Sequence, residues 1–151
     1  MTMKQQRQGG FLIAKIHQLA GRIFARKLKE HQIDDLNPAQ GRIMFVLWRE
    51  DGISINELAQ RTSLGKSTLT SMLDRLERSG HLTRVPSRED RREILIRRTD
   101  KDRALEEVYV RASQEMTELF YAGFVPSGID RLETGLQRVY DNLAAFERAT
   151  K

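Results

Sequence analysis

The spacing of apolar residues along the chain predicts a mainly helical protein with one small β-hairpin. From Phe11, apolar residues recur at intervals of three and four, which predicts an amphipathic helix that ends near residues 31–35. Asn37 and Pro38 have the residue types of a helix N-cap and of a first helical position. The helix that they start carries the apolar run of residues 43–48.

The last third of the chain repeats this helical spacing. Thr99 has a residue type that caps helices, and an apolar stripe at residues 105–120 follows it. Pro126 interrupts the pattern, and Ser127 can cap a last helix whose stripe continues to Phe146. The two terminal regions carry more apolar surface than one small domain covers, so we expect them to pair with a second copy of the chain.

Between these regions, residues 54–80 predict two short helices in succession. Residues 54–57 match a capping box, in which a serine oxygen accepts from a backbone amide and a glutamate reaches back to the cap. The second helix is predicted from about Lys66 to Ser79, and Gly80 ends it. Its apolar residues share one face and are Leu69, Met72, Leu73 and Leu76.

A charged hairpin follows the second of these helices. Residues 81–85 predict a strand, Pro86 ends it, residues 87–92 form a tip that is almost entirely charged, and residues 93–98 return. This order is that of a helix-turn-helix with a basic wing. The predicted fold class is therefore mainly α with a small β-wing, a winged helix-turn-helix flanked by long dimerisation helices.

These patterns divide the chain into regions. We expect a disordered tail at residues 1–10, which are rich in glutamine and end in two glycines. Dimerisation helices are expected at residues 11–35 and 100–151, and a winged helix-turn-helix DNA-binding domain at residues 36–99.

The polar face of the second central helix suits the major groove of duplex DNA, where hydroxyl and basic groups can meet base edges or phosphates. The residues on or beside this face are Lys66, Ser67, Thr68, Thr70, Ser71 and Arg75. The expected wing contacts are Arg88, Asp90, Arg91 and Arg92, and the expected phosphate contacts at the start of the preceding helix are Ser54 and Asn56. The alternative is that the hydroxyl residues are ordinary solvated positions.

The distribution of charge favours the nucleic-acid interpretation. The formal net charge is +5 and the isoelectric point is about 9.8. Residues 61–103 hold 12 basic and seven acidic residues, whereas residues 104–151 hold five basic and eight acidic ones. Clustered basic groups displace counterions from a nucleic-acid backbone. A merely solvated basic face would not predict an acidic last third.

Several classes of protein are disfavoured by what the sequence lacks. There is no cysteine, so disulfides, thiolate sensing and cysteine-ligated zinc are excluded, and three scattered histidines disfavour a metal sensor. We expect no metal site and no cofactor. The apolar run of residues 43–48 is too short to span a bilayer and no signal-peptide core is present, so the expected location is the cytoplasm.

Two further classes compete with a DNA-binding protein. An enzyme is disfavoured because the chain has no glycine-rich phosphate loop, no nucleophile elbow and no paired carboxylates at a sensible spacing. A winged helix that contacts protein or RNA remains the other alternative. The major groove of duplex RNA is too narrow for a helix, so duplex DNA is the expected partner.

The motifs of the central region resemble those of the MarR family of winged-helix transcriptional regulators over residues 11–148. The similar stretches are Ser67-Thr68-Leu69-Thr70, Leu73-Asp74-Arg75-Leu76-Glu77-Arg78-Ser79-Gly80, Asp90-Arg91-Arg92 and Thr99. Three positions depart from the family pattern: Arg98 replaces a leucine, Asp102 replaces a glycine, and Ser71 stands where many members carry arginine.

The resemblance implies roles for particular residues. It places Ser67, Thr68 and Thr70 at the major groove or its phosphates, and Arg92 in the minor groove with Asp90 orienting it. The alternative for Asp90 and Arg92 is a plain surface ion pair.

The resemblance also implies a homodimer on a near-palindromic operator and a repressor released by a small aromatic or phenolic effector; the residues alone do not distinguish a repressor from an activator. The effector crevice would be lined by His17, Met44, Trp48 and Met72, for which core packing is the alternative, above all for the two methionines.

Overall fold

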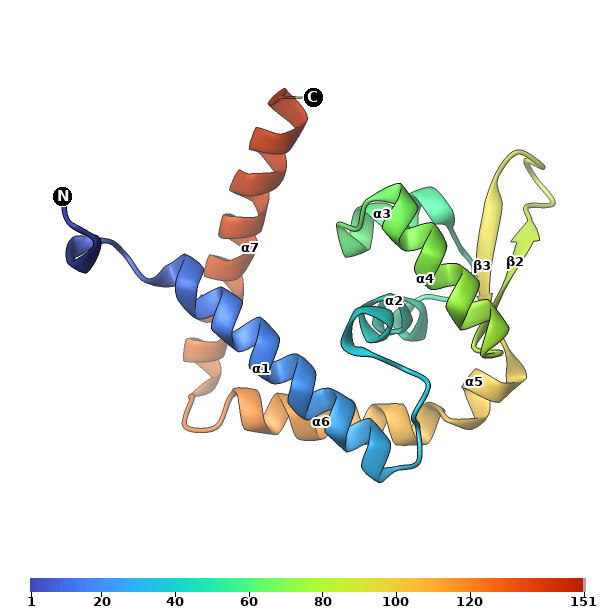
Figure 1. Ribbon diagram of the computed structural model, residues 1–151, viewed down its shortest axis with the longest axis horizontal. Helices are drawn as coiled ribbons and strands as arrows, with labels where there is room; N and C mark the ends of the chain where they lie inside the picture. The colour runs from blue at the N-terminus through green and yellow to red at the C-terminus, as the bar shows by residue number, and fades with distance from the viewer. Residues whose placement is uncertain (151) are drawn as a thin grey trace. The chain divides into compact units, whose positions relative to one another are not determined.

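The computed structural model describes residues 1–150, apart from the side chain of Pro38 (Figure 1). The elements in chain order are the 3-10 helix η1 (Met3–Gln5), α1 (Gly9–Glu30), α2 (Pro38–Arg49), β1 (Ile53–Ser54), α3 (Ile55–Thr62), α4 (Lys66–Arg78), β2 (Leu82–Pro86), β3 (Ile94–Arg98), α5 (Asp100–Ala104), α6 (Glu106–Phe120) and α7 (Pro126–Thr150). The predicted fold class, mainly α with a small β-wing, is confirmed. The chain divides into two compact units after Ser113.

The start of α2 is the predicted cap. The Asn37 side chain accepts from the backbone N–H of Gln40 at 2.8 Å, and the Gln40 side chain accepts from the backbone N–H of Asn37 at 3.1 Å. Each of these bonds satisfies an amide that the helix itself leaves without a partner. Pro38 occupies the first helical position, where no backbone N–H is needed.

The capping box predicted at the start of α3 is only half present. The hydroxyl of Ser54 accepts from the backbone N–H of Glu57 at 3.1 Å, as expected. The carboxylate of Glu57 does not complete the box, because it pairs with Arg61 one turn further along the helix. The ion pair with a guanidinium thus replaces the predicted bond to the cap amide.

The end of α4 shows why a glycine stands there. Gly80 has a φ of +82°, a left-handed conformation that costs a residue with a side chain free energy. The turn lets the N–H of Gly80 donate to Glu77 O and that of His81 donate to Leu76 O. The chain therefore leaves the helix in a fixed direction toward the wing.

The sheet has three antiparallel strands in the order β1-β3-β2, and the short strand β1 was not predicted. The sequence predicts that β2 ends before Pro86. In the structure, Pro86 is instead the last residue of β2 and pairs with Ile94. A proline is tolerated there because β2 is an edge strand and has a free side. His81 lies outside β2, which begins at Leu82.

Two predicted helices differ in their bounds. The helix expected to run on from the Thr99 cap is interrupted at Leu105, so that α5 and α6 are separate. The last helix begins at Pro126, so Ser127 lies inside its first turn and is not the cap. The expected tail, residues 1–10, contains η1 and the first two residues of α1.

The core of the first unit fixes the orientation of α4. Its buried apolar residues come from α1, the α1–α2 linker, α2, α3, α4, α6 and all three strands, and are Leu28, Ile33, Leu36, Ile43, Met44, Leu47, Ile53, Leu58, Leu69, Leu73, Leu76, Leu82, Ile96, Tyr109 and Ala112. Because Leu69, Leu73 and Leu76 of α4 have no exposed surface, the opposite face of α4 points to solvent. No helix within residues 1–150 is long and apolar enough to cross a membrane.

Candidate nucleic-acid interface

The polar face of α4 is fully presented to solvent. All six residues predicted for it are exposed: Lys66, Ser67, Thr68, Thr70, Ser71 and Arg75. They lie on a helix whose far side is anchored by three buried leucines, so their positions are set by packing and not by loop conformation. Figure 1 shows α4 in green next to the yellow hairpin of β2 and β3.

The first turn of α4 is suited to an anion. Gly65 is its N-cap and supplies no side-chain bond, so the first backbone N–H groups of the helix are not capped by a side chain. Lys66, Ser67 and Thr68 are the exposed residues of this turn. Uncapped amides, the positive end of the helix dipole and a lysine together favour a phosphate.

The wing carries a braced arginine. Arg92 donates from Nε to Oδ1 of Asp90 at 3.2 Å, and its backbone N–H donates to the same oxygen at 3.1 Å. The side chain of Arg92 is nevertheless 93% exposed. Asp90 is held in turn, because the Ser87 hydroxyl accepts from its backbone N–H at 3.3 Å. The arginine is thus oriented but accessible, and Arg88 and Arg91 are exposed beside it.

The structure brings the wing together with the start of α3. A hollow of about 190 Å³ is lined by Ser54, Ile55, Asn56, Arg92, Glu93 and Ile94. Two sets of residues predicted separately, those at the start of α3 and those of the wing, therefore share one surface. Asn56 is exposed, whereas Ser54 is buried and its hydroxyl oxygen serves as the helix cap.

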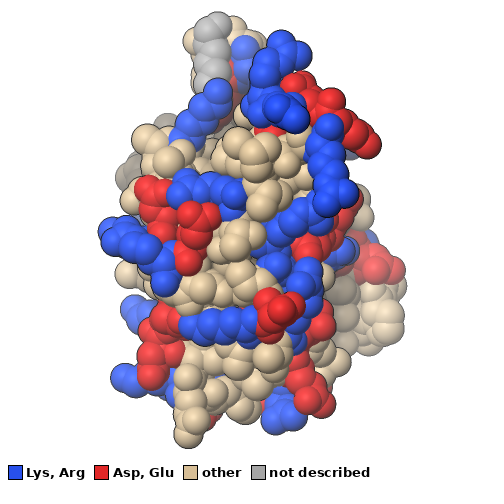
Figure 2. All heavy atoms as spheres, turned by 90° about the vertical axis from the view of Figure 1, so that its right-hand side faces the viewer, with Lys and Arg blue, Asp and Glu red and all other residues tan. Residues whose placement is uncertain are grey.

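Not every basic residue of this region is available to a partner. Within residues 1–150, no acidic side chain pairs with Lys66, Arg75, Arg88 or Arg91. Arg61, in contrast, is paired with Glu50 at 2.6 Å and also with Glu57. Figure 2 shows this mixture, with basic and acidic side chains interleaved over one face of the molecule.

Sequence reasoning missed a connection between α4 and the wing. Arg84 of β2 donates from Nη2 to Asp74 at 2.6 Å and to Glu77 at 3.3 Å, both on α4. These hydrogen bonds, the one to Glu77 first, raise the pKa of Arg84. The signal was present, since Asp74 and Glu77 are the two acidic residues of the stretch that resembles the MarR motif.

The four residues predicted for an effector crevice have different environments. His17 is exposed on α1 and lies 3.4 Å from Nη2 of Arg42. Met44 is fully buried in the core, and Met72 is half-buried against it. Trp48 is half-buried and stacks on Tyr109, with ring centroids 4.2 Å apart. The effector crevice stays a prediction.

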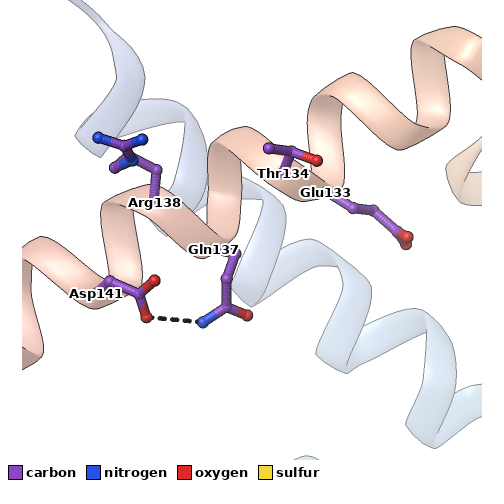
Figure 3. A pocket seen from close by; sticks show the side chains of 5 residues that line it. All are labelled: Glu133, Thr134, Gln137, Arg138 and Asp141. Carbon is purple, nitrogen blue, oxygen red and sulfur yellow. Dashed lines mark hydrogen bonds between the residues drawn. The ribbon is translucent and has the colours of Figure 1, made fainter.

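A second hollow, of about 420 Å³, lies along α7 (Figure 3). It is lined by Glu133, Thr134, Gln137, Arg138 and Asp141, and Gln137 donates to Asp141 at 2.9 Å. All five residues belong to a single helix, which cannot enclose a small molecule by itself. None of the predicted effector residues lines this hollow.

The outer helices expose large apolar side chains. On α1 these are Phe11, Leu12, Ile13, Ile16 and Leu19, and on α7 they are Leu136, Val139, Tyr140, Leu143 and Phe146. Leu143 and Phe146 are 66% and 70% exposed. Apolar stripes of this length are typical of helices that pair with another chain.

Comparison with known proteins identifies related regulators. A family profile described as the MarR family matches residues 36–94. The transcriptional regulator TtmR of Methylorubrum extorquens is 41% identical over 85 residues, which are 56% of this chain and 42% of TtmR. The chain spans less than half the length of the first two curated relatives it matches.

Solved structures extend the likeness to nearly the whole chain. A MarR mutant from E. coli complexed with operator DNA has a TM-score of 0.73 and 26% identity, covering 86% of this chain and 91% of that one. Bordetella bronchiseptica BpsR, described with regulation of its DNA binding by 6-hydroxynicotinic acid, has a TM-score of 0.77 and 22% identity, covering 93% and 97%.

Proposed function

The chain belongs to the MarR family, and on that premise we propose that it is a sequence-specific regulator of transcription that binds double-stranded DNA. The observation that carries the proposal is that two exposed elements lie in the same winged helix-turn-helix region. They are the polar face of α4 and the wing arginine Arg92, which Asp90 braces. Each suits a different groove of the duplex.

The major groove is assigned to α4, which is called the recognition helix from here on. Ser67, Thr68 and Thr70 are short enough to let the helix approach the bases, and their hydroxyls can donate to or accept from base edges and phosphates. Lys66 and Arg75 supply charge without an acidic partner inside residues 1–150. Ser71 in place of the family's arginine leaves a shorter side chain, which favours a different operator sequence or a weaker hold on the backbone.

The minor groove is assigned to Arg92. A narrow minor groove concentrates negative potential, which attracts a guanidinium. The contact with Asp90 limits the conformations that Arg92 must give up on binding, so less entropy is lost. Arg88, Arg91 and Asn56 lie where they can contact adjoining phosphates, which fixes the register of the protein on the duplex.

Two copies are proposed to pair through their outer helices. The exposed apolar stripes of α1 and α7 are the surfaces that pairing would bury. A two-fold axis then relates the two recognition helices, so the operator is a near-palindrome with half-sites roughly 34 to 36 Å apart. The protein acts in the cytoplasm, where it meets chromosomal DNA.

The regulator is proposed to be a repressor that a small aromatic or phenolic effector releases. An effector that binds better to dimers whose recognition helices are wrongly spaced for DNA shifts the population away from the DNA-binding form. BpsR, whose fold this chain shares, is described as responding to a hydroxylated aromatic acid.

The test is a mobility-shift titration with the promoter region of the protein's own gene. Duplex DNA of that region is expected to shift, and unlabelled duplex is expected to compete far better than RNA of the same sequence. Equal competition by the RNA, or no shift of any promoter fragment, would contradict the proposal. The RNA arm separates the DNA-binding function from the alternative of an RNA-binding winged helix.

A further inference from the structure

A group of ionisable side chains is buried in the first unit, where the α1–α2 linker, the end of α4 and α5 meet. His81 has no exposed surface. Its Nε2 lies 2.9 Å from Oδ2 of Asp35, and its Nδ1 lies 3.7 Å from Oδ1 of Asp102. The hydroxyl of Tyr109 lies 3.3 Å from the same Nδ1. We refer to these four residues with Arg98 as the His81 cluster.

Basic side chains complete the His81 cluster. Arg98 donates from Nε to Asp102 at 2.5 Å and from Nη1 to Glu106 at 3.1 Å, and Lys101 donates to Asp35 at 3.3 Å. Burial raises the pKa of Asp102, but the hydrogen bond and the positive charge of Arg98, with His81 close by, outweigh it and hold that pKa below its ordinary value. The pKa of Asp35 is likewise lowered, because the approach of His81 at 2.9 Å and the hydrogen bond and charge of Lys101 outweigh burial. Both carboxylates are therefore ionised at neutral pH.

Two residues of the cluster are departures from the family pattern. Arg98 and Asp102 replace a leucine and a glycine, and the structure shows that they are partners. Their side chains are 7% and 0% exposed. A buried charge without its partner is strongly destabilising, so either substitution alone would destabilise the fold. One buried ion pair thus accounts for both departures.

The hydrogen bonds of the His81 cluster are incomplete. Within residues 1–150, the buried atoms without a well-formed hydrogen bond include His81 Nε2, Arg98 Nη2 and Asp102 Oδ1. The approach of Asp35 to His81 is close enough for charge attraction but lacks hydrogen-bond geometry. Partly satisfied buried networks are costly, so a change that supplies one of the missing partners stabilises the cluster.

The protonation state of His81 decides which arrangement is satisfied. In the neutral ring with its proton on Nε2, Nδ1 accepts from the Tyr109 hydroxyl, and Oδ1 of Asp102 stays at 3.7 Å. In the charged ring Nδ1 carries a proton, so it can no longer accept from Tyr109 and needs an acceptor. Asp102 is that acceptor once the two atoms approach by about 0.9 Å, to the usual length of a charge-assisted bond.

Backbone contacts connect His81 to the interface. Its N–H donates to Leu76 O at 2.9 Å, which closes the last turn of α4. Its carbonyl accepts from the N–H of Thr99, at the end of β3, at 3.3 Å. The backbone of His81 is therefore bonded both to the end of α4 and to the residue that follows β3.

We propose that His81 is a positioning residue for the recognition helix and that its protonation makes the DNA affinity of the protein depend on pH. The proposal rests on the proposed DNA-binding function. Histidine is the side chain that ordinarily changes charge between about pH 5 and 8. The other two histidines, His17 and His31, are exposed and half-buried, so neither has the enclosed setting of His81.

The first test needs no DNA. Trp48 is the only tryptophan of the chain and stacks on Tyr109, so its fluorescence reports on the cluster. Measured at a series of pH values between about 5 and 8, the emission of the wild type is expected to change and that of His81→Gln is not. His31→Gln, the matched control, is expected to show the same change as the wild type. An identical titration in His81→Gln, or none in the wild type, overturns the proposal.

The second test measures DNA affinity at constant salt near both ends of this pH range. The ratio of the two dissociation constants is expected to differ at least about fivefold between the wild type and His81→Gln. Equal ratios overturn the positioning role. Should His81→Gln fail to fold, the double variant Arg98→Leu/Asp102→Gly removes the second acceptor with the residue types usual in the family, and is expected to show the same loss of pH dependence.

The two tests separate this proposal from the proposed function. If the wild type binds no duplex at any pH, the DNA-binding function fails while the fluorescence titration still decides whether His81 changes its charge. If duplex DNA binds with the same pH dependence in both proteins, only the role of His81 fails.

Discussion

Arg84 of β2 and Asp74 of α4 are joined by a hydrogen-bonded ion pair of 2.6 Å, which ties the wing to the recognition helix. The backbone N–H of Arg84 adds a bond to Glu77 of the same helix at 2.9 Å. The two elements that are proposed to enter adjacent grooves therefore move as one body. The arrangement matters because DNA contacts of both must be made at once.

Replacing Arg84 by methionine tests this connection. The variant keeps most of the side-chain length but loses the charge, so we expect a loss of about 0.5 to 1 kcal/mol in the free energy of unfolding, as for a partly exposed pair. Operator affinity should fall more than this loss explains, because the wing is no longer fixed. The matched control is Arg97→Met, an exposed arginine of β3 without an acidic partner in the described residues. Equal affinities of the two variants would argue against the connection.

Thr70→Ala is expected to change sequence preference more than overall affinity. Thr70 lies in the middle of the exposed face of α4, where its hydroxyl and methyl groups can meet base edges. Binding to a set of operators with single base changes should show relaxed discrimination at one position per half-site, by about 1 to 3 kcal/mol. Thr134→Ala on α7 is the control. A uniform loss over all operators would instead place Thr70 at a phosphate.

Arg92→Ala is expected to weaken binding and to lower the salt dependence. The log–log slope of affinity against salt should decrease by about 1 for each protomer, because one positive charge that displaces counterions from the groove is lost. Arg138→Ala on α7 removes the same charge far along the chain and should leave the slope as it is. An unchanged slope in Arg92→Ala would remove the wing from the interface.

The double variant Leu143→Ser/Phe146→Ser is expected to dissociate the proposed dimer. Both side chains are largely exposed on α7, so the change costs the isolated chain little while it removes apolar surface from the pairing. Sedimentation should show a protomer at concentrations where the wild type is a dimer, with a matching loss of operator affinity because half-sites then bind independently. Asn142→Ser is the control, and a dimeric double variant would exclude this part of α7.

Asp102 is expected to contribute to acid sensitivity. Its pKa is held below its ordinary value of 3.8 in the folded protein, so the carboxylate stabilises the fold above that pH. This contribution is lost as the pH falls through the lower pKa of the folded state. Urea unfolding at a series of acidic pH values should show a shallower loss of stability for Asp102→Asn than for the wild type. Asp130→Asn, an exposed change, is the control, and parallel curves for all three proteins would contradict the assignment.

Much of the fold could be predicted because it depends on local patterns. The apolar spacing of α4 fixes its buried face, and Gly80 and Asn37 have the residue types that end or begin helices. The exposed residues of α4 and the wing follow from the same patterns. Their roles in DNA binding stay proposals that rest on the family and on the geometry.

The errors have physical causes that a local pattern does not contain. Pro86 remains in β2 because its strand is at the edge of the sheet, and the position of a strand in a sheet is set by long-range pairing. The His81 cluster joins residues as far apart in sequence as Asp35 and Asp102. Arg98 and Asp102 could be seen only as two separate departures until the structure showed them in contact.

The most direct test of the central claim is a footprint of the purified protein on the promoter region of its own gene, with the oligomeric state measured in the same buffer. The account predicts a dimer that protects a near-palindrome with half-sites roughly 34 to 36 Å apart. A stable protomer at micromolar concentration, together with no protected palindrome, would contradict it.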